Sequence, residues 1–67
     1  MKVVYDAEVD IIRITLNDTA IEESDEEKSG LILDYDANGN VVGMEILNAS
    51  QRTSNPRSLE YAVAEAA

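Results

Sequence analysis

The stretch GLILDYDANGNVVGMEIL, residues 30–47, decides the fold, because it holds two apolar strands around a tight turn. Asn38 and Gly39 separate the alternating apolar runs, and both residue types accept positive φ, so the dipeptide is a strong β-hairpin signal. A two-residue loop gathers apolar side chains on one face, whereas a three-residue loop would mix them with acids. Because register is set by burying one face, we predict the two-residue loop. The predicted pairs are Leu31 with Ile46, Leu33 with Met44, and Tyr35 with Val42.

Two further strands precede this hairpin, KVVY at 2–5 and DIIRITL at 10–16. The second alternates apolar and polar residues, which is typical of a half-buried strand. Residues 17–29 predict a solvated loop with a short edge strand near 20–22. Together these segments predict an antiparallel meander of about four strands. Its predicted core consists of Leu31, Leu33, Tyr35, Val42, Met44 and Ile46, with Ile12, Ile14 and Leu16.

The sequence changes character after residue 47. Residues 48–55 form a polar connection, and Asn55 and Pro56 are typical of a helix N-cap followed by the first helical residue. We therefore predict a helix over 56–66 that packs on the sheet. The predicted fold is α+β, a single domain over 1–67. The apolar stripe of this helix would consist of Leu59, Ala62, Val63 and Ala66.

The composition excludes several kinds of site. The 67 residues include no Cys and no His, which removes disulfides, thiolate and imidazole metal ligands, and histidine-activated nucleophiles. The net charge of −9 disfavours direct binding to nucleic acid or to anionic membrane surfaces. No apolar run is long enough to span a bilayer and no signal peptide is recognisable, so we expect a cytoplasmic protein. We expect neither enzyme activity nor a cofactor.

The small size of the chain bears on its partners. A domain of this length buries only about 60% of its unfolded surface, so a partner subunit is a favoured source of stability. We therefore predict a homodimer, or folding completed on another protein.

Residues 34–45, DYDANGNVVGME, also match the pattern of an EF-hand calcium loop. An EF-hand needs a helix on each side, and here both flanks are strand-like. In the predicted register Asp34 faces Gly43 and Glu45 faces Ile32, which does not close a loop around one ion. We favour the turn and expect no metal site, with weak calcium or magnesium binding as the alternative. The candidate ligands would be Asp34, Asp36, Asn38 and Glu45.

Two other features admit a structural and a functional interpretation. Asp6, Glu8 and Asp10 would line one face if extended and could then hold a cation, but a turn in which Asp6 is the capping residue is favoured. Gly43 would leave open space on the face of Asp34 and Glu45, where another backbone or a helix could approach.

The run EESDEE at 22–27 holds five carboxylates in six positions. It is either a solvated loop or a contact surface for a basic protein. The best functional hypothesis is a small acidic interaction module. Its candidate contact residues are Glu22, Glu23, Asp25, Glu26 and Glu27.

A family resemblance is carried by YDAEVDIIRITL, by the short acidic loop after it, and by GLILDYDANGNVVGMEIL with NASQR. Together these segments resemble a family of small prokaryotic domains catalogued as domain of unknown function 2283. The resemblance covers residues 1–52. It implies no established activity and no catalytic or ligand residues. Some family members are encoded beside small toxin-like domains, which implies an antitoxin-like role with a small basic partner. Ala7 departs from the family, in which proline is common at this position.

Overall fold

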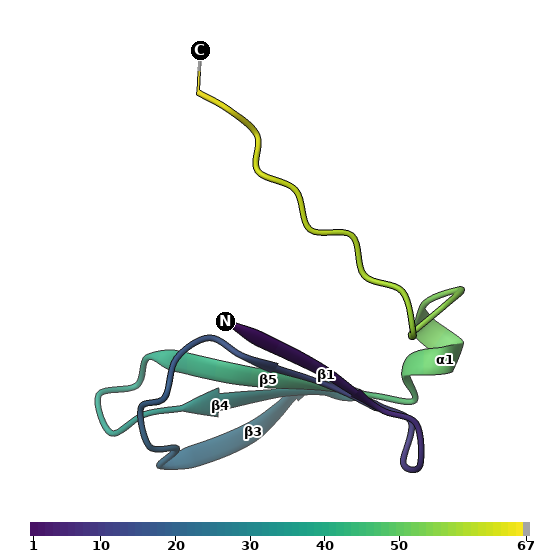
Figure 1. The fold of residues 1–67 in the computed structure, drawn as a ribbon. Helices are drawn as coiled ribbons and strands as arrows, with labels where there is room; N and C mark the ends of the chain where they lie inside the picture. Colours follow the sequence, from purple (N-terminus) through teal and green to yellow (C-terminus); the bar gives the residue numbers. More distant parts are fainter. Residues whose placement is uncertain (67) are drawn as a thin grey trace.

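The computed structural model describes residues 1–66, and Ala67 of the predicted domain lies outside them. Most of the chain forms one antiparallel sheet, followed by a short helix (Figure 1). The described part has five strands and not about four, because part of the predicted acidic loop is itself a strand. The elements are β1 (Lys2–Asp6), β2 (Ile11–Thr15), β3 (Glu23–Lys28), β4 (Leu31–Tyr35), β5 (Val41–Leu47) and α1 (Ala49–Arg52).

The strand order is β1-β2-β5-β4-β3, so only the last three strands form a meander. The β1-β2 hairpin joins this meander through an antiparallel pairing of β2 with β5. The connection from β2 to β3 must therefore pass from the middle of the sheet to its far edge. Its residues 17–19 and Ile21 line a shallow pocket with Asp34, Val42 and Gly43, so the connection covers part of β4 and β5.

The central hairpin has the predicted strand register but not the predicted loop. Pairing of Leu31 with Ile46 and of Leu33 with Met44 is confirmed. The loop has three residues, 37–39, and is closed by the Asp36 N–H donating to the Asn40 carbonyl at 2.9 Å. A register shift after Asp34 pairs Tyr35 with Val41 instead of Val42. This bulge absorbs the extra loop residue, so the strands still separate apolar from polar side chains.

Strand pairing collects uncharged side chains on one side of β1, β2, β5 and β4, which we call the apolar face. Its members are Val3, Tyr5, Ile12, Ile14, Met44, Ile46, Leu31 and Leu33. Within residues 1–66 no large side chain is fully buried, and the buried apolar residues are Val42 and Ala49. The residues predicted to form the core therefore share a face, but that face is only half-buried. Leu16, which was predicted to join them, is exposed.

The predicted helix over 56–66 is wrong. Asn55 does start a turn, because its Oδ1 accepts from the Arg57 N–H at 3.0 Å and its carbonyl accepts from the Ser58 N–H at 3.2 Å. Residues 58–66, the C-terminal segment, then run away from the sheet without helical structure (Figure 1). A helix this short is marginal in water unless it docks, and here the chain leads away from the surface that would support it.

Helix α1 lies instead within the predicted polar connection. Asp10 anchors it, since its Oδ2 accepts from the Ser50 hydroxyl at 2.6 Å and its carbonyl accepts from the Ala49 N–H at 3.0 Å. Arg52 at the other end donates from Nε to the Leu47 carbonyl at 3.1 Å. None of the helices in the part of the chain that the structure describes is long and apolar enough to cross a membrane.

Candidate interaction surface

Strand β3 is the most acidic element and forms one edge of the sheet. All six of its residues, ESDEEK, are exposed. The prediction of a loop over 17–29 is wrong for this part. Acidic residues have low strand propensity, but pairing with β4 supplies the backbone hydrogen bonds that a loop would lack. Just before the strand, the Glu22 N–H donates to the Tyr35 carbonyl at 2.8 Å and so extends the contact with β4.

The structure brings the five predicted contact residues together on this edge. Strand pairing places Glu23 and Asp25 on the side of the apolar face, opposite Tyr35 and Leu33, and directs Glu26 to the other side. Glu27 lies at a bulge between these two directions. The carboxylates are therefore presented on both sides of the strand. We call Glu22, Glu23, Asp25, Glu26 and Glu27 the acidic edge.

Tyr35 connects the acidic edge to the body of the sheet. Its hydroxyl donates to Glu27 Oε1 at 2.6 Å. This hydrogen bond, together with partial burial and the negative charges of Glu27, Asp25 and Glu23, raises the pKa of Tyr35 to about 12. The sequence pattern assigned Tyr35 to packing and gave no signal for this contact, because β3 was not expected as a strand. A shallow pocket beside it is lined by Glu22, Glu23, Asp25, Tyr35, Asp36, Ala37 and Gly39.

Replacing Glu27 with glutamine should lower the pKa of Tyr35 towards 10, because the phenol would lose its hydrogen bond to a charged acceptor. The raised pKa means that the folded state holds the phenolic proton more tightly than the unfolded state does. Its contribution to stability is thus complete below about pH 10 and is lost between about pH 10 and 12. Titration of the Tyr35 ring resonances by NMR measures the change. Glu26→Gln is the matched control and should leave Tyr35 unchanged; an equal effect of both variants would contradict the assigned contact.

Two of the four candidate calcium ligands, Asp34 and Glu45, take part in separate structural contacts. Asp34 is buried and accepts from the Ser24 hydroxyl at 2.6 Å, and it pairs with Gly43 as predicted. Glu45 pairs with Ile32, also as predicted, and its Oε1 lies 3.6 Å from Arg13 Nε. Residues 1–66 contain no group of three or more acidic side chains placed to hold a metal ion.

The remaining two residues of the calcium pattern form the hairpin turn. Asp36 Oδ1 accepts from the N–H groups of Asn38 and Asn40, both at 2.9 Å. The backbone hydrogen bond from Asn40 is the main reason that the pKa of Asp36 lies below its usual value. The turn interpretation of this stretch therefore has a direct structural basis, which is a carboxylate that caps the loop.

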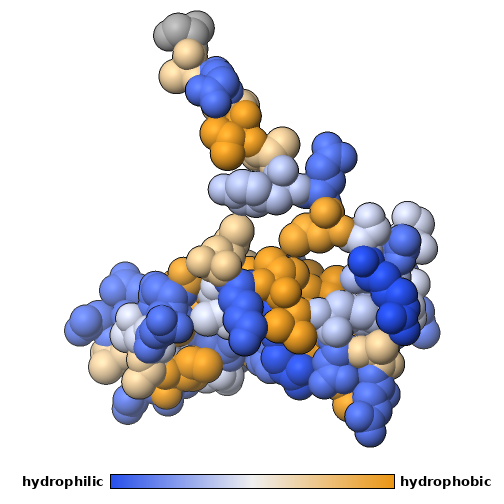
Figure 2. All heavy atoms as spheres, in the orientation of Figure 1, coloured by the Kyte–Doolittle hydropathy of each residue, from blue (hydrophilic) through white to orange (hydrophobic). Residues whose placement is uncertain are grey.

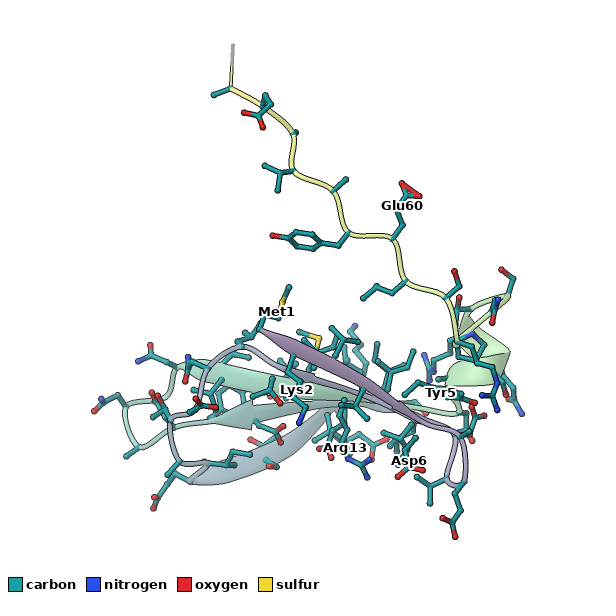
Figure 3. All side chains as sticks on the ribbon, viewed as in Figure 1. Met1, Lys2, Tyr5, Asp6, Arg13 and Glu60 are labelled. Carbon is teal, nitrogen blue, oxygen red and sulfur yellow. The ribbon has the colours of Figure 1, made fainter. Side chains whose placement is uncertain are left out.

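The segment with Asp6, Glu8 and Asp10 is a turn, as predicted. Asp6 Oδ1 accepts from the Glu8 N–H at 3.1 Å, and Asp6 Oδ2 lies 3.3 Å from Arg13 Nη1. Figure 3 shows Asp6 and Arg13 on the same side of the sheet. Asp10 points elsewhere and accepts from the Tyr5 hydroxyl at 2.7 Å as well as from Ser50.

Asp10 connects strand β1 to helix α1 through its contacts with Tyr5 and Ser50, which the sequence did not indicate. Hydrogen bonds from Ser50, and then from Tyr5, hold the pKa of its carboxyl below the usual value. Its backbone has a positive φ of 58°. Such a conformation is several-fold enriched in Asp, but no local pattern shows that the side chain will contact a residue 40 positions away.

The comparisons with known proteins identify the family of the chain and nothing finer. Neither the curated proteins nor the solved structures contain a match to the chain. One family model, described as Protein of unknown function (DUF2283), matches residues 2–50. That range includes all five strands and the start of α1. The match covers well over half of the sequence and agrees with the resemblance noted from the sequence. The chain therefore belongs to the family described as Protein of unknown function (DUF2283).

Proposed function

We propose that this protein is an acidic interaction module whose acidic edge binds a basic segment of a partner protein. The observation that carries the proposal is that β3 is both an edge strand and fully exposed. Among the described strands it pairs with β4 alone, so one row of its backbone N–H and C=O groups faces outward. An extended peptide can add to such an edge as a further strand, with main-chain hydrogen bonds providing affinity.

Charge determines which peptide would fit. Edge strands with charged side chains resist pairing with copies of themselves, since like charges oppose one another directly across the strands. A strand that carries Lys or Arg at alternate positions turns this repulsion into attraction. The basic side chains of such a strand all lie on one side, where Glu23 and Asp25 would meet them. An antitoxin-like role, in which the partner is a small basic toxin, is one case of this proposal.

The test uses an extended peptide with alternating lysine and valine, followed by NMR titration. Amide shifts should centre on β3, and the affinity should fall as salt is added, because exposed ion pairs are screened within about 8 Å at physiological ionic strength. The triple variant Glu23→Gln, Asp25→Asn, Glu27→Gln should weaken binding by about tenfold, given roughly 0.2–1 kcal/mol for each exposed pair.

The matched control removes the same number of charges elsewhere, through Glu8→Gln, Asp18→Asn and Glu60→Gln. It should bind the peptide nearly as well as the natural sequence does. Equal loss in both triple variants would show that the peptide senses only total charge and would overturn the acidic edge as the site.

A further inference from the structure

We propose that a second copy of this chain covers the apolar face, giving a sandwich of two sheets packed face to face. Stable domains consist of at least two packed layers around a core. Here the strand residues on one side of β1, β2, β5 and β4 are all uncharged. Within the described residues only Val42 and Ala49 are buried apolar side chains. The second layer is therefore the part that this fold lacks. Figure 2 shows the apolar side chains gathered beneath the C-terminal segment.

The exposed area agrees with a missing layer of this size. The chain exposes 5200 Å². By the usual scaling of area with mass, a compact monomer of 7.3 kDa exposes about 4,200 Å². The excess of about 1,000 Å² per chain compares with the roughly 800 Å² that each partner buries in a standard interface. Large apolar residues are exposed both on the sheet, as Val3 is, and in the C-terminal segment, as Leu59 is.

The C-terminal segment lies on the same side as the apolar face. Arg57 stacks over the ring of Tyr5 at 5.9 Å, and beyond it Leu59 and Tyr61 line a shallow pocket with Met1 and Val3. Three apolar side chains at alternate positions remain exposed there. They are Leu59 at 69%, Tyr61 at 73% and Val63 at 67%. In the dimer these side chains lie along the second copy and leave water together with the face.

The distribution of charge favours a second copy over a basic partner on this surface. The strand residues of the apolar face on β1, β2, β5 and β4 are all uncharged. Among these strand residues a basic protein would find no carboxylate, and it would bury its own charges there without compensation, which is costly. Another uncharged face of equal size avoids this cost, and the second copy provides one. The exposed acids of the strands remain on the acidic edge and on the opposite face, in water.

Val3 and Val4 give a matched pair of test positions. They are neighbours on β1 with similar exposure, 37% and 41%, but Val3 pairs with Ile14 on the apolar face and Val4 pairs with Arg13 on the other. In sedimentation equilibrium at micromolar concentration, the natural sequence should be a dimer. Val3→Asp should raise the dissociation constant by roughly 30-fold or more, the size of an interface hot spot. Val4→Asp should leave the dissociation constant within about threefold.

Salt provides a measurement that needs no variant. Because both copies carry a net charge of −9, added salt should tighten the dimer, whereas it should weaken binding of a basic peptide to the acidic edge. The triple β3 variant should still dimerise, so failure of the proposed function and failure of the dimer are distinguishable. A monomer under all conditions, or equal dissociation by Val3→Asp and Val4→Asp, would overturn this proposal.

Discussion

Replacing Gly30 with alanine should lower the free energy of unfolding by about 2–3 kcal/mol. Gly30 has a φ of +77°, a left-handed conformation that costs a residue with a Cβ about 1–2 kcal/mol. The added Cβ would also lie only 2.3 Å from Arg52 Nη2. That guanidinium donates to the carbonyls of Ser29 and Leu47, and moving it would weaken both hydrogen bonds at a further cost of about 1 kcal/mol.

Gly39 provides the matched control for this substitution. Its φ of +80° is nearly the same, but an added Cβ would meet no atom within 4 Å. Gly39→Ala should therefore cost only the backbone term of about 1–2 kcal/mol. Urea unfolding at a fixed protein concentration measures both values, since oligomerisation makes stability depend on concentration.

A double-mutant cycle isolates the contact with Arg52. In an Arg52→Ala background, Gly30→Ala should cost no more than Gly39→Ala does, because the side chain that it displaces is absent. If Gly30→Ala is as costly without Arg52 as with it, the positive φ alone explains the glycine and the link between helix α1 and the β3-β4 turn contributes nothing.

The hairpin at the centre of the sheet was predictable because its signals are local. The alternation of apolar residues predicted how residues 31–34 pair with residues 43–46, and the structure confirms this pairing. The loop length was wrong because the side chain of Asp36 favours a three-residue turn by accepting from two backbone N–H groups. A bulge then restores the register, which shows that burial of one face has more influence than ideal turn geometry.

Elements that depend on distant contacts were not predictable in the same way. Strand β3 has a sequence with poor strand propensity and forms because β4 offers an edge. Helix α1 is only four residues long and depends on Asp10, which lies about 40 residues earlier. Residues 56–66 have good helix propensity, yet no helix forms where nothing supports it.

The candidate contact surface was predictable in composition but not in geometry. The five acids of the acidic edge are evident in the sequence, whereas their presentation on both sides of an edge strand requires the pairing with β4. The contact between Tyr35 and Glu27 follows from the same pairing. The calcium pattern illustrates the opposite case, since its letters match although the oxygen atoms of Asp34, Asp36 and Glu45 have separate partners.

Gly43 is a position where the structure corrects one part of the interpretation of the sequence, namely the room for a side chain. The sequence suggested open space beside it for an approaching backbone or helix. In the structure Gly43 is buried, and an added Cβ would lie 3.1 Å from both Asp34 Oδ2 and the Ile14 carbonyl oxygen. An added side chain would therefore meet the neighbouring strands of the same sheet, and the pocket beside Gly43 is lined by the β2-β3 connection. Glycine is required here for close packing and not for a positive φ.

Gly43→Val should therefore lower the free energy of unfolding by about 3 kcal/mol, at the upper end of the cost of overpacking. The branched side chain would displace the buried Asp34 carboxylate from its hydrogen bond with Ser24, while the Ile14 carbonyl, held in the β2-β5 pairing, cannot move away. Gly43→Ala should cost about 1 kcal/mol, since small shifts of Asp34 accommodate one methyl group.

The same measurement in an Asp34→Ala background identifies the cause. Removing the carboxylate relieves one of the two close contacts and leaves the other, so Gly43→Val should become less costly there without becoming neutral. Had the space beside Gly43 been open, valine would cost little in either background, and urea unfolding of the single variant would show this at once. A full-sized loss in both backgrounds would instead place the whole cost on the Ile14 carbonyl, because only that contact is common to the two proteins.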